Sequence, residues 1–410
     1  MLVVNTYWVG LSFMWNGLHG IVLPAVIADI VPGNEKNTYL GLLTSIGLVI
    51  AVIIQPLSGA LTDNWASHWG RRRPWITFGT LFDFVFLAVI GWAGGLTWIF
   101  IGYLGLQLSS NIAQGPVQGL MPDVIPQEQL AQASGLKIFI DMGSAAAAVI
   151  VTGILLGSKA EYSGLVMTLI IGILLVSAAI TIFGTPEQAS TRAKRVNPWK
   201  EMRDSFRIDF RANTAYWWLI GQRFVFLLGV YGIQAFAQNY LRDVLNVADP
   251  PRDTGILLGI VTVSLIIFAA ASGWLINRWG MTRMLIVASM VTAIGSVLLW
   301  FGRTQGTLLL FGSILGAGVG LFLTANWTLA NKLAPPDEAG KYLGLTNLAT
   351  AGAGVVARAA GALWDIFNNA APGSWDGYMI LFFSAGFFAL ISIALIGMIE
   401  PPSKKVAVPS

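Results

Sequence analysis

Four amide side chains follow one another at helical spacing within an apolar stretch near residues 97–121. They are Gln107, Asn111, Gln114 and Gln118, separated by 4, 3 and 4 positions. On a helix of 3.6 residues per turn, this spacing keeps them within about 40° of one line. An amide donates and accepts hydrogen bonds without carrying charge. Because an unpaired polar group in apolar surroundings costs free energy, the row predicts a polar cavity or a bond to a partner helix.

Three further apolar stretches, the first, seventh and tenth along the chain, carry similar rows. In chain order the rows are Asn5, Ser12, Asn16 and His19; Arg223, Tyr231, Gln234 and Gln238; and Thr324, Trp327 and Asn331. The first, fourth, seventh and tenth helices are equivalent in a chain built from triplets of helices, so we expect all four rows to face one central cavity. The residues expected to bind a substrate there are Asn16, Gln107, Asn111, Gln114, Gln118, Tyr231, Gln234 and Trp327.

The chemistry of these rows favours a neutral, polyhydroxylated solute. Amides and hydroxyls would bond its rim, and aromatic rings would face its carbons. A sugar suits this lining better than an ion. The alternative is that the amides merely join helices, each bond contributing about 1 kcal/mol.

Among the ionisable side chains inside apolar stretches, the ones that need explaining are Asp83, Asp141, Arg223 and Arg358. Each would cost at least about 2.5–3.5 kcal/mol in the middle of a membrane, which makes each a functional candidate. Asp141 is expected either to carry a coupling proton or to form an ion pair with Arg223. We expect Arg358 to stabilise the interface between the two halves and Asp83 to make a structural hydrogen bond.

A compact charged hairpin separates two of the apolar stretches. It runs from Gly59 to Pro74 and contains Asp63 and the triplet Arg71, Arg72 and Arg73. The segment Gly273–Arg283, with Arg278, repeats part of it. The carboxylate is expected to pair with the arginines and with a helix end, forming a gate that breaks when the halves move. The gating candidates are Asp63, Arg71, Arg72, Arg73 and Arg278.

The elements that position these residues are long apolar helices. Charged residues make up 11% of the chain and hydrophobic residues 55%, with a mean hydropathy of +0.70. A helix needs about 20 apolar residues to cross the hydrocarbon core. We predict an all-α membrane protein with twelve transmembrane helices, near residues 2–30, 39–62, 75–95, 97–121, 135–157, 164–184, 215–240, 254–276, 281–302, 307–331, 342–364 and 377–399.

Two duplicated landmarks predict two pseudo-symmetric bundles of six helices. The hairpin recurs at an offset of 214 residues, and a Pro-x-Glu loop before a Gly-Leu pair, beginning at Pro126, recurs from Pro336 at an offset of 210. Agreement between the offsets indicates a duplicated six-helix unit. The predicted division is bundle 1–184, central cytoplasmic loop 185–214, bundle 215–400 and cytoplasmic tail 401–410.

Basic residues predict the orientation. If the Arg71–Arg73 loop is cytoplasmic, 17 of the 24 lysines and arginines fall on that side and 5 on the other. The positive-inside rule then places both termini in the cytoplasm. The first stretch lacks the pattern of a cleaved signal peptide, so we interpret it as a retained helix. The short loops favour a prokaryotic inner membrane, and we expect a monomer.

The same residues argue against several other kinds of protein. The chain has no cysteine and two distant histidines, so we expect no metal site and no cofactor. The run Gly153–Lys159 lacks the spacing of a phosphate-binding loop. No nucleophile, base and acid stand together, and the basic residues sort by membrane side. We therefore expect neither an enzyme nor a nucleic-acid-binding protein.

The duplicated hairpin, the twelve spans and the central loop resemble the major facilitator superfamily. The stretch Gly70-Arg-Arg-Arg-Pro74, the motif Asn111-x-x-Gln-Gly-Pro116 and Trp15 before Pro24 resemble its sucrose-transporter branch, the glycoside-pentoside-hexuronide cation symporters. Two positions depart from that resemblance. Where plant sucrose transporters carry an aspartate and an arginine, this chain has Gln107 and Gln118.

The expected function is therefore secondary transport of an uncharged sugar or glycoside by alternating access. Proton or sodium symport is preferred, although the two departures remove the residues that the resemblance implies for proton coupling and sugar binding. An uncoupled facilitator and an exporter of an amphipathic small molecule are alternatives. A different class is a non-transporting membrane factor that assembles pigment complexes.

Overall fold

The computed structural model describes residues 1–63, 65–157, 163–187, 189, 213–335 and 339–399. These residues form helices joined by short turns, and no strand occurs among them. The predicted all-helical fold is therefore confirmed. The predicted tail 401–410 and nearly all of the predicted central loop 185–214 lie outside the described residues.

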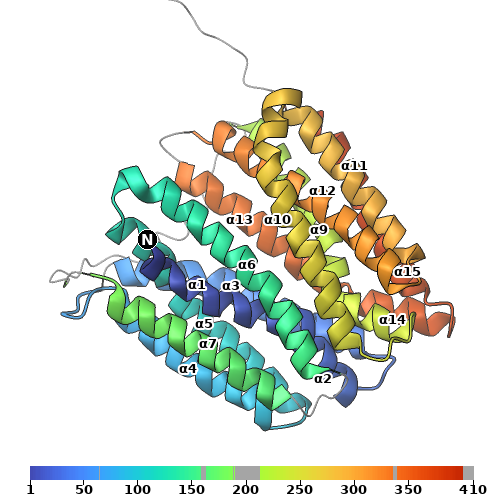
Figure 1. The fold of residues 1–410 in the computed structure, drawn as a ribbon, viewed down its shortest axis with the longest axis horizontal. Helices are drawn as coiled ribbons and strands as arrows, with labels where there is room; N and C mark the ends of the chain where they lie inside the picture. The colour runs from blue at the N-terminus through green and yellow to red at the C-terminus, as the bar shows by residue number, and fades with distance from the viewer. Residues whose placement is uncertain (64, 158–162, 188, 190–212, 336–338, 400–410) are drawn as a thin grey trace, which may run out of the picture.

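The first half of the chain forms six long helical segments that pack on one another (Figure 1). They are the segment α1 (Leu2–Gly17), η1 (Leu18–Val22) and α2 (Leu23–Ile30), followed by α3 (Lys36–Asp63), α4 (Arg73–Trp92), α5 (Leu96–Val124), α6 (Leu130–Leu156) and α7 (Ser163–Gly184). A short 3-10 turn, η2 (Gln127–Gln129), precedes α6. We refer to residues 1–187 as the first half.

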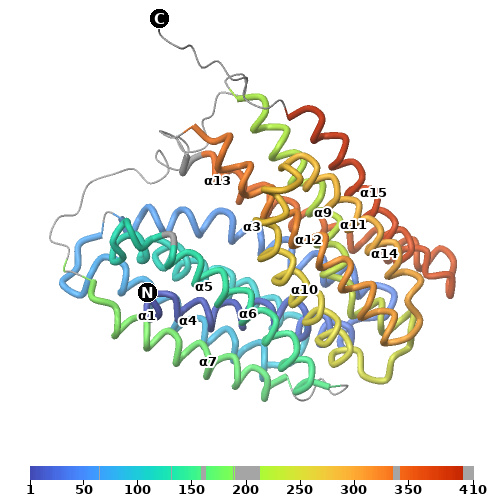
Figure 2. Tube along the Cα trace, turned by 45° about the horizontal axis from the view of Figure 1, so that its top comes forward, coloured from blue at the N-terminus to red at the C-terminus, as the bar shows by residue number. Residues whose placement is uncertain are grey.

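The second half, residues 213–399, repeats this pattern with six more segments. They are α9 (Thr214–Asp243), α10 (Pro250–Trp279), α11 (Met281–Phe301), α12 (Gln305–Leu333), the pair α13 (Ala339–Ala359) and α14 (Gly361–Ala370), and α15 (Asp376–Ile396). Figure 2 shows the two groups side by side, with α3 and α6 of the first half facing α13 and α10 of the second. The domain limits drawn from the sequence remain a prediction.

Ten of the described helical segments are long and apolar enough to cross a membrane. The helix α5, which carries the amide row, and the pair α13–α14 are the long segments not among these ten. Their polar residues lower the hydropathy of helices that still have the length to span a bilayer. With these two the count of long segments is the predicted twelve.

The first span is interrupted by one π-helical turn at Leu18–Val22. Pro24 follows it and has no N–H to donate to the preceding turn, so the backbone pairing must be rearranged there. A π-turn turns the residues on either side of it relative to each other and is common at functional sites. His19 lies within this turn.

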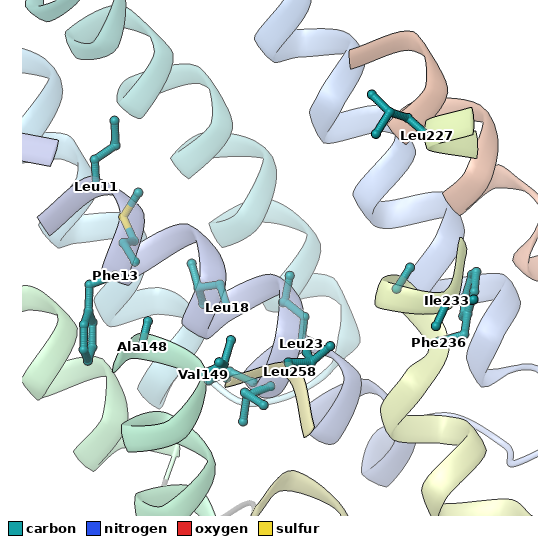
Figure 3. Packing of buried hydrophobic residues seen from close by; sticks show 14 of the residues in the cluster. Leu11, Phe13, Leu18, Leu23, Ala148, Val149, Leu227, Ile233, Phe236 and Leu258 are labelled. Atoms are coloured by element: carbon teal, nitrogen blue, oxygen red, sulfur yellow. The ribbon is translucent and has the colours of Figure 1, made fainter. Parts of the chain in front are cut away.

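Buried apolar side chains form one large cluster that runs through both halves. Figure 3 shows Val149 of α6, Leu23 of α2 and Leu258 of α10 close together. A Cβ added at Gly20 would lie 3.3 Å from both Val149 and Leu258, so the two halves touch where η1, α6 and α10 meet.

Candidate functional site

A cavity of about 290 Å³ lies between the two halves. The first half contributes α1, η1, α3 and α5 to its wall, and the second half contributes α13. Its polar lining consists of His19, Gln55, Gln107, Asn111, Gln114 and Asn347. Its other lining residues are Trp15, Leu48, Ala51, Val52, Pro56, Gly344, Leu348 and Ala351. No Asp, Glu, Lys or Arg occurs among these lining residues.

Three of the four amides predicted on α5 meet at this cavity: Gln107, Asn111 and Gln114. Gln107 donates from Nε2 to the Tyr103 hydroxyl at 2.7 Å. Asn111 donates from Nδ2 to the backbone oxygen of Gln107 at 2.7 Å and to its Oε1 at 3.2 Å. These bonds order the amide row but leave further donor and acceptor capacity for a ligand.

An aromatic corner stands beside the amides. The rings of Trp15 and His19 are stacked with centroids 5.1 Å apart, and Tyr103 meets both rings edge-on. His19 Nε2 and the Tyr103 hydroxyl share a hydrogen bond of 2.7 Å. The result is a chain of bonds from His19 through Tyr103 to Gln107, next to the half-buried Trp15 indole, which lines the cavity and can pack on the carbons of a ring.

The remaining predicted binding residues lie outside the lining of this cavity. Asn16 turns back along its own helix and donates to the backbone oxygen of Ser12 at 2.9 Å. Gln118 lies one turn beyond Gln114 and is exposed. Tyr231 and Gln234 are half-buried on α9, and Trp327 on α12 is 37% exposed. The rows of the seventh and tenth spans therefore do not reach the space that α5 and α13 enclose in this conformation.

The two coupling candidates, Asp141 and Arg223, contact different parts of the molecule. Asp141 accepts a hydrogen bond from Ser12 of α1 and attracts Lys137 one turn earlier on α6. Arg223 donates to Thr350 at 2.8 Å and to Asn326 at 2.9 Å, both in the second half. The ion pair considered between Asp141 and Arg223 is not formed in this structure.

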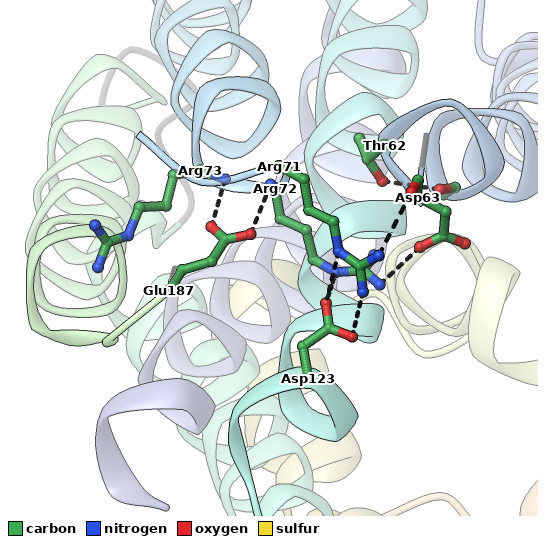
Figure 4. Close-up of polar contacts among 8 residues, drawn as sticks. Thr62, Asp63, Arg71, Arg72, Arg73, Asp123 and Glu187 are labelled. Atoms are coloured by element: carbon green, nitrogen blue, oxygen red, sulfur yellow. Dashed lines mark hydrogen bonds and ion pairs between the residues drawn. The ribbon is translucent and has the colours of Figure 1, made fainter. Parts of the chain in front are cut away.

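The charged hairpin ties three helix ends of the first half together (Figure 4). Arg72, which is 5% exposed, donates to Asp63 at 2.8 Å and also to Asp123 near the end of α5. Arg71 donates two hydrogen bonds to the carboxylate of the same Asp123, at 2.6 and 3.2 Å. This bidentate bond raises the pKa of the Arg71 guanidinium.

The backbone of the hairpin is held as well. The N–H groups of Arg72 and Arg73 donate to the two carboxylate oxygens of Glu187 at 2.9 and 3.1 Å. All these partners belong to the first half. The partial repeat in the second half differs, because Arg278 is exposed and its guanidinium lies 5.7 Å from the ring of Trp274 on its own helix. We call the side of the molecule that carries this hairpin the hairpin end.

At the opposite side, which we call the Lys36 end, a polar network joins the two halves. Lys36 at the start of α3 forms an ion pair with Asp243 at the end of α9. Tyr378 of α15 donates to the second oxygen of Asp243 at 2.6 Å. Asn37 accepts from Asn239 of α9 at 2.7 Å. Among the described residues, every hydrogen bond and ion pair between the halves lies at this end.

Asp365 of α14 is the second acidic group of this network. It accepts from Asn37 at 2.8 Å and from the backbone and hydroxyl of Thr38 at 2.6 and 2.7 Å. The backbones touch here too: a Cβ at Gly41 would collide with the carbonyl oxygen of Arg358, and one at Gly361 with that of Asn37. The cavity is thus sealed from the Lys36 end.

Sequence reasoning missed several residues of the cavity. Gln55 and Asn347 are single amides without a row on their helices, so periodicity could not select them. Trp15 was noticed as part of a motif but not as a wall of the site. The signal available for Asn347 was its position on the helix face of Gly344 and Ala351, which is visible only once the partner helix is known.

Long apolar helices arranged as two groups of six, enclosing a neutral polar cavity that is sealed at one end, define a membrane transporter. The chain belongs to the Major Facilitator Superfamily, because the sequence profile of that family matches residues 8–358. The family resemblance inferred from the sequence motifs is confirmed, and the protein is not an enzyme.

Curated relatives match short parts of the chain. The sucrose transport protein SUC4 of Arabidopsis thaliana is 26% identical over 140 residues, which is 30% of this chain and 27% of that protein. The lactose permease of Leuconostoc lactis is 35% identical over 65 residues, or 15% of this chain and 10% of that protein. This chain therefore spans about a quarter or less of the length of these relatives.

Solved structures match the whole fold at low identity. A D-xylose-proton symporter aligns with a TM-score of 0.76 and 14% identity, covering 98% of both chains. A bacterial homolog of the human lysosomal transporter Spinster, in an inward-facing and unoccupied conformation, aligns with a TM-score of 0.77 and 15% identity over 97% of this chain and 96% of that one. At these identities the similarity establishes the fold.

Proposed function

We propose that this protein is a secondary transporter that carries an uncharged sugar or glycoside across a prokaryotic inner membrane by alternating access. The observation that carries the proposal is the cavity itself, where three α5 amides face Asn347 of α13 across a lining without ionised side chains. Neutral donors and acceptors beside the ring of Trp15 are suited to hydroxyl groups on a carbon ring. The similarity to a sucrose transport protein and a lactose permease supports the same substrate class.

Alternating access is supported by the distribution of contacts between the halves. Polar contacts between described residues of the two halves gather at the Lys36 end, while the cavity wall formed by α3 and α13 lies toward the hairpin end. If both termini are cytoplasmic, this conformation faces inward. Breaking the Lys36-end network and closing α3 on α13 would present the same amides to the other side.

Coupling to a proton or sodium ion is the preferred mode, with Asp141 and Arg223 as the candidate groups. Asp141 lies on α6 and bonds Ser12 of α1, so a change in its charge would act between these two helices. The hairpin residues Asp63, Arg71, Arg72 and Arg73 are proposed to gate the cytoplasmic side together with Arg278. In this structure the first four bond only to residues of the first half, among the residues that the structure describes.

The decisive experiment is uptake of labelled disaccharides and hexoses into proteoliposomes, with and without a pH or sodium gradient. Gradient-stimulated uptake supports symport, and uptake without a gradient effect supports a facilitator. Gln114→Leu should abolish binding while the protein still folds, whereas Gln127→Leu, at an exposed position in η2, should not. If no sugar is transported under any condition, the exporter and the pigment-assembly factor become the better explanations.

A further inference from the structure

Arg358 lies on the face of α13 that lines the cavity, two turns beyond the last lining residue. Gly344, Asn347 and Ala351 follow one another at helical spacing, and Arg358 comes seven residues after Ala351. Seven residues are close to two full turns, so the two side chains leave the helix in nearly the same direction. The residue is 8% exposed, and its carbonyl oxygen contacts Gly41 at the Lys36 end.

The Arg358 guanidinium has little to bind in the protein. Its Nη1 donates to the backbone oxygen of Gly354 at 3.3 Å, and in the described part of the chain no carboxylate lies within ion-pair distance. A guanidinium has five N–H donors. Arg223, the other buried arginine inside a span of the second half, differs because Thr350 and Asn326 accept its hydrogen bonds.

Contacts around Gly354 show where the guanidinium points. A Cβ at that position would lie 3.1 Å from Arg358 Nη1, 3.3 Å from Leu48 of α3 and 3.7 Å from Tyr231 of α9. Leu48 lines the cavity, and the guanidinium carbon lies 6.0 Å from the centre of the Tyr231 ring. The cation therefore lies between the two halves, next to Leu48 of the cavity wall, although Arg358 is not itself among the lining residues.

We propose that Arg358 is a substrate-binding residue, whose free N–H groups donate to hydroxyl oxygens at the inner end of the sugar. The inference rests on the proposed function and adds the group that distinguishes one end of the substrate from the other. Amides of α5 can exchange donor and acceptor roles, but a guanidinium only donates and holds two adjacent oxygens in a fixed fork. A buried cation without a counter-charge gains from such acceptors.

The first test needs no substrate and uses the fact that the chain contains no cysteine. Single variants Arg358→Cys, Ala351→Cys and Ala353→Cys are treated with a small water-soluble thiol reagent in proteoliposomes. Ala351 lines the cavity and Ala353 is fully buried, so they are the positive and negative controls. Labelling of position 358 is expected. If position 358 stays as unreactive as position 353, the side chain does not reach the cavity and the proposal is wrong.

The second test measures sugar affinity. Arg358→Gln should weaken binding of a transported sugar about 10- to 100-fold, because the hydrogen bonds from a charged donor are lost. Arg358→Lys keeps the charge but not the fork and should recover only part of the loss. Arg303→Gln, which removes an exposed arginine at the end of α11, is the matched control and should bind normally. Thermal unfolding of each variant checks that it is folded.

A series of deoxy sugars distinguishes direct contact from an indirect effect. The analogue that lacks the contacted hydroxyl should bind equally to the original protein and to Arg358→Gln, because the shared bond is absent in both. If every analogue weakens by the same factor in the variant, or if Arg358→Gln leaves affinity unchanged, Arg358 does not bind the sugar although the proposed function stands. If the original protein binds no sugar, the proposed function fails, whatever the labelling at position 358.

Discussion

Asn37 of α3 donates a hydrogen bond to Asp365 of α14 at 2.8 Å, and these residues are 328 positions apart in the chain. The bond joins the two halves at the Lys36 end, where Thr38 supplies two further donors to the same carboxylate. Asp365 is 5% exposed, so its partners replace water almost completely. A transporter that alternates must break this bond each time it opens this end.

Replacing Asp365 with Asn should therefore favour the conformation that is open at the Lys36 end. An amide cannot accept from both N–H groups that now face the carboxylate and also leaves its own donors unmatched, at a cost of about 1–3 kcal/mol. The fraction open at this end should rise about 5- to 100-fold. A single Leu40→Cys, buried at 2% exposure, reports the change as faster labelling by an impermeant thiol reagent.

The control for this measurement is Asp376→Asn, which removes a carboxylate from the same end without touching Asn37 or Thr38. Equal labelling of Leu40→Cys in the Asp365→Asn and Asp376→Asn backgrounds would show that the network does not hold the Lys36 end closed. The prediction concerns the equilibrium between conformations, so it can be checked before any substrate is known.

Gly41 tests the backbone contact at the same end. A methyl group there would collide with the carbonyl oxygen of Arg358, whereas one at Gly33 meets nothing within 4 Å. Gly41→Ala should cost the closed conformation about 1–3 kcal/mol through overpacking, and Gly33→Ala should have no such effect. Labelling of Leu40→Cys is the readout. If Gly41→Ala leaves the labelling rate of Leu40→Cys unchanged, α3 and α13 have enough room to accept the added methyl group.

The features that could be predicted from the sequence are those whose signal comes from residues close together in the chain. Hydropathy and duplicated loops are local and repeated, so they predicted the helices and the family. The spacing of Gln107, Asn111 and Gln114 is a property of one helix, and the structure places these three at the cavity. Gln118 continues the same row, yet it lies beyond the cavity because the row says nothing about where the facing wall ends.

Pairings between distant helices could not be derived in this way. The contacts of Asn37 with Asp365 and of Arg72 with Asp123 depend on how helices meet in one conformation. The expected pairing of Asp63 with an arginine was a short-range inference across a hairpin, and Arg72 makes that bond. The break between α13 and α14 at Ala360 carried no proline and was predicted as part of one span.

Arg72 should contribute more to stability than its neighbour Arg71. It is 5% exposed and bonds both Asp63 and Asp123, while the side chain of Arg71 is 34% exposed. Arg72→Gln should lower the free energy of unfolding by about 2–3 kcal/mol, a value reduced for the exposure of its partners. Arg71→Gln should cost less than about 1 kcal/mol. Thermal unfolding in detergent gives the order, and equal losses would contradict the role assigned to Arg72.

Asp141 offers the sharpest test of coupling, because its replacement can affect coupling to the ion gradient without removing a contact to the sugar. It is half-buried on α6, bonds Ser12 and lies beside Lys137, and it is not among the residues that line the cavity. If Asp141 carries the coupling ion, Asp141→Asn should reduce gradient-driven accumulation at least tenfold. Exchange of labelled for unlabelled sugar should continue. Ser12→Ala removes the bond but keeps the carboxylate, so it should retain accumulation. Loss of both accumulation and exchange in Asp141→Asn would instead assign Asp141 a structural role between α1 and α6, and full accumulation would remove it from coupling.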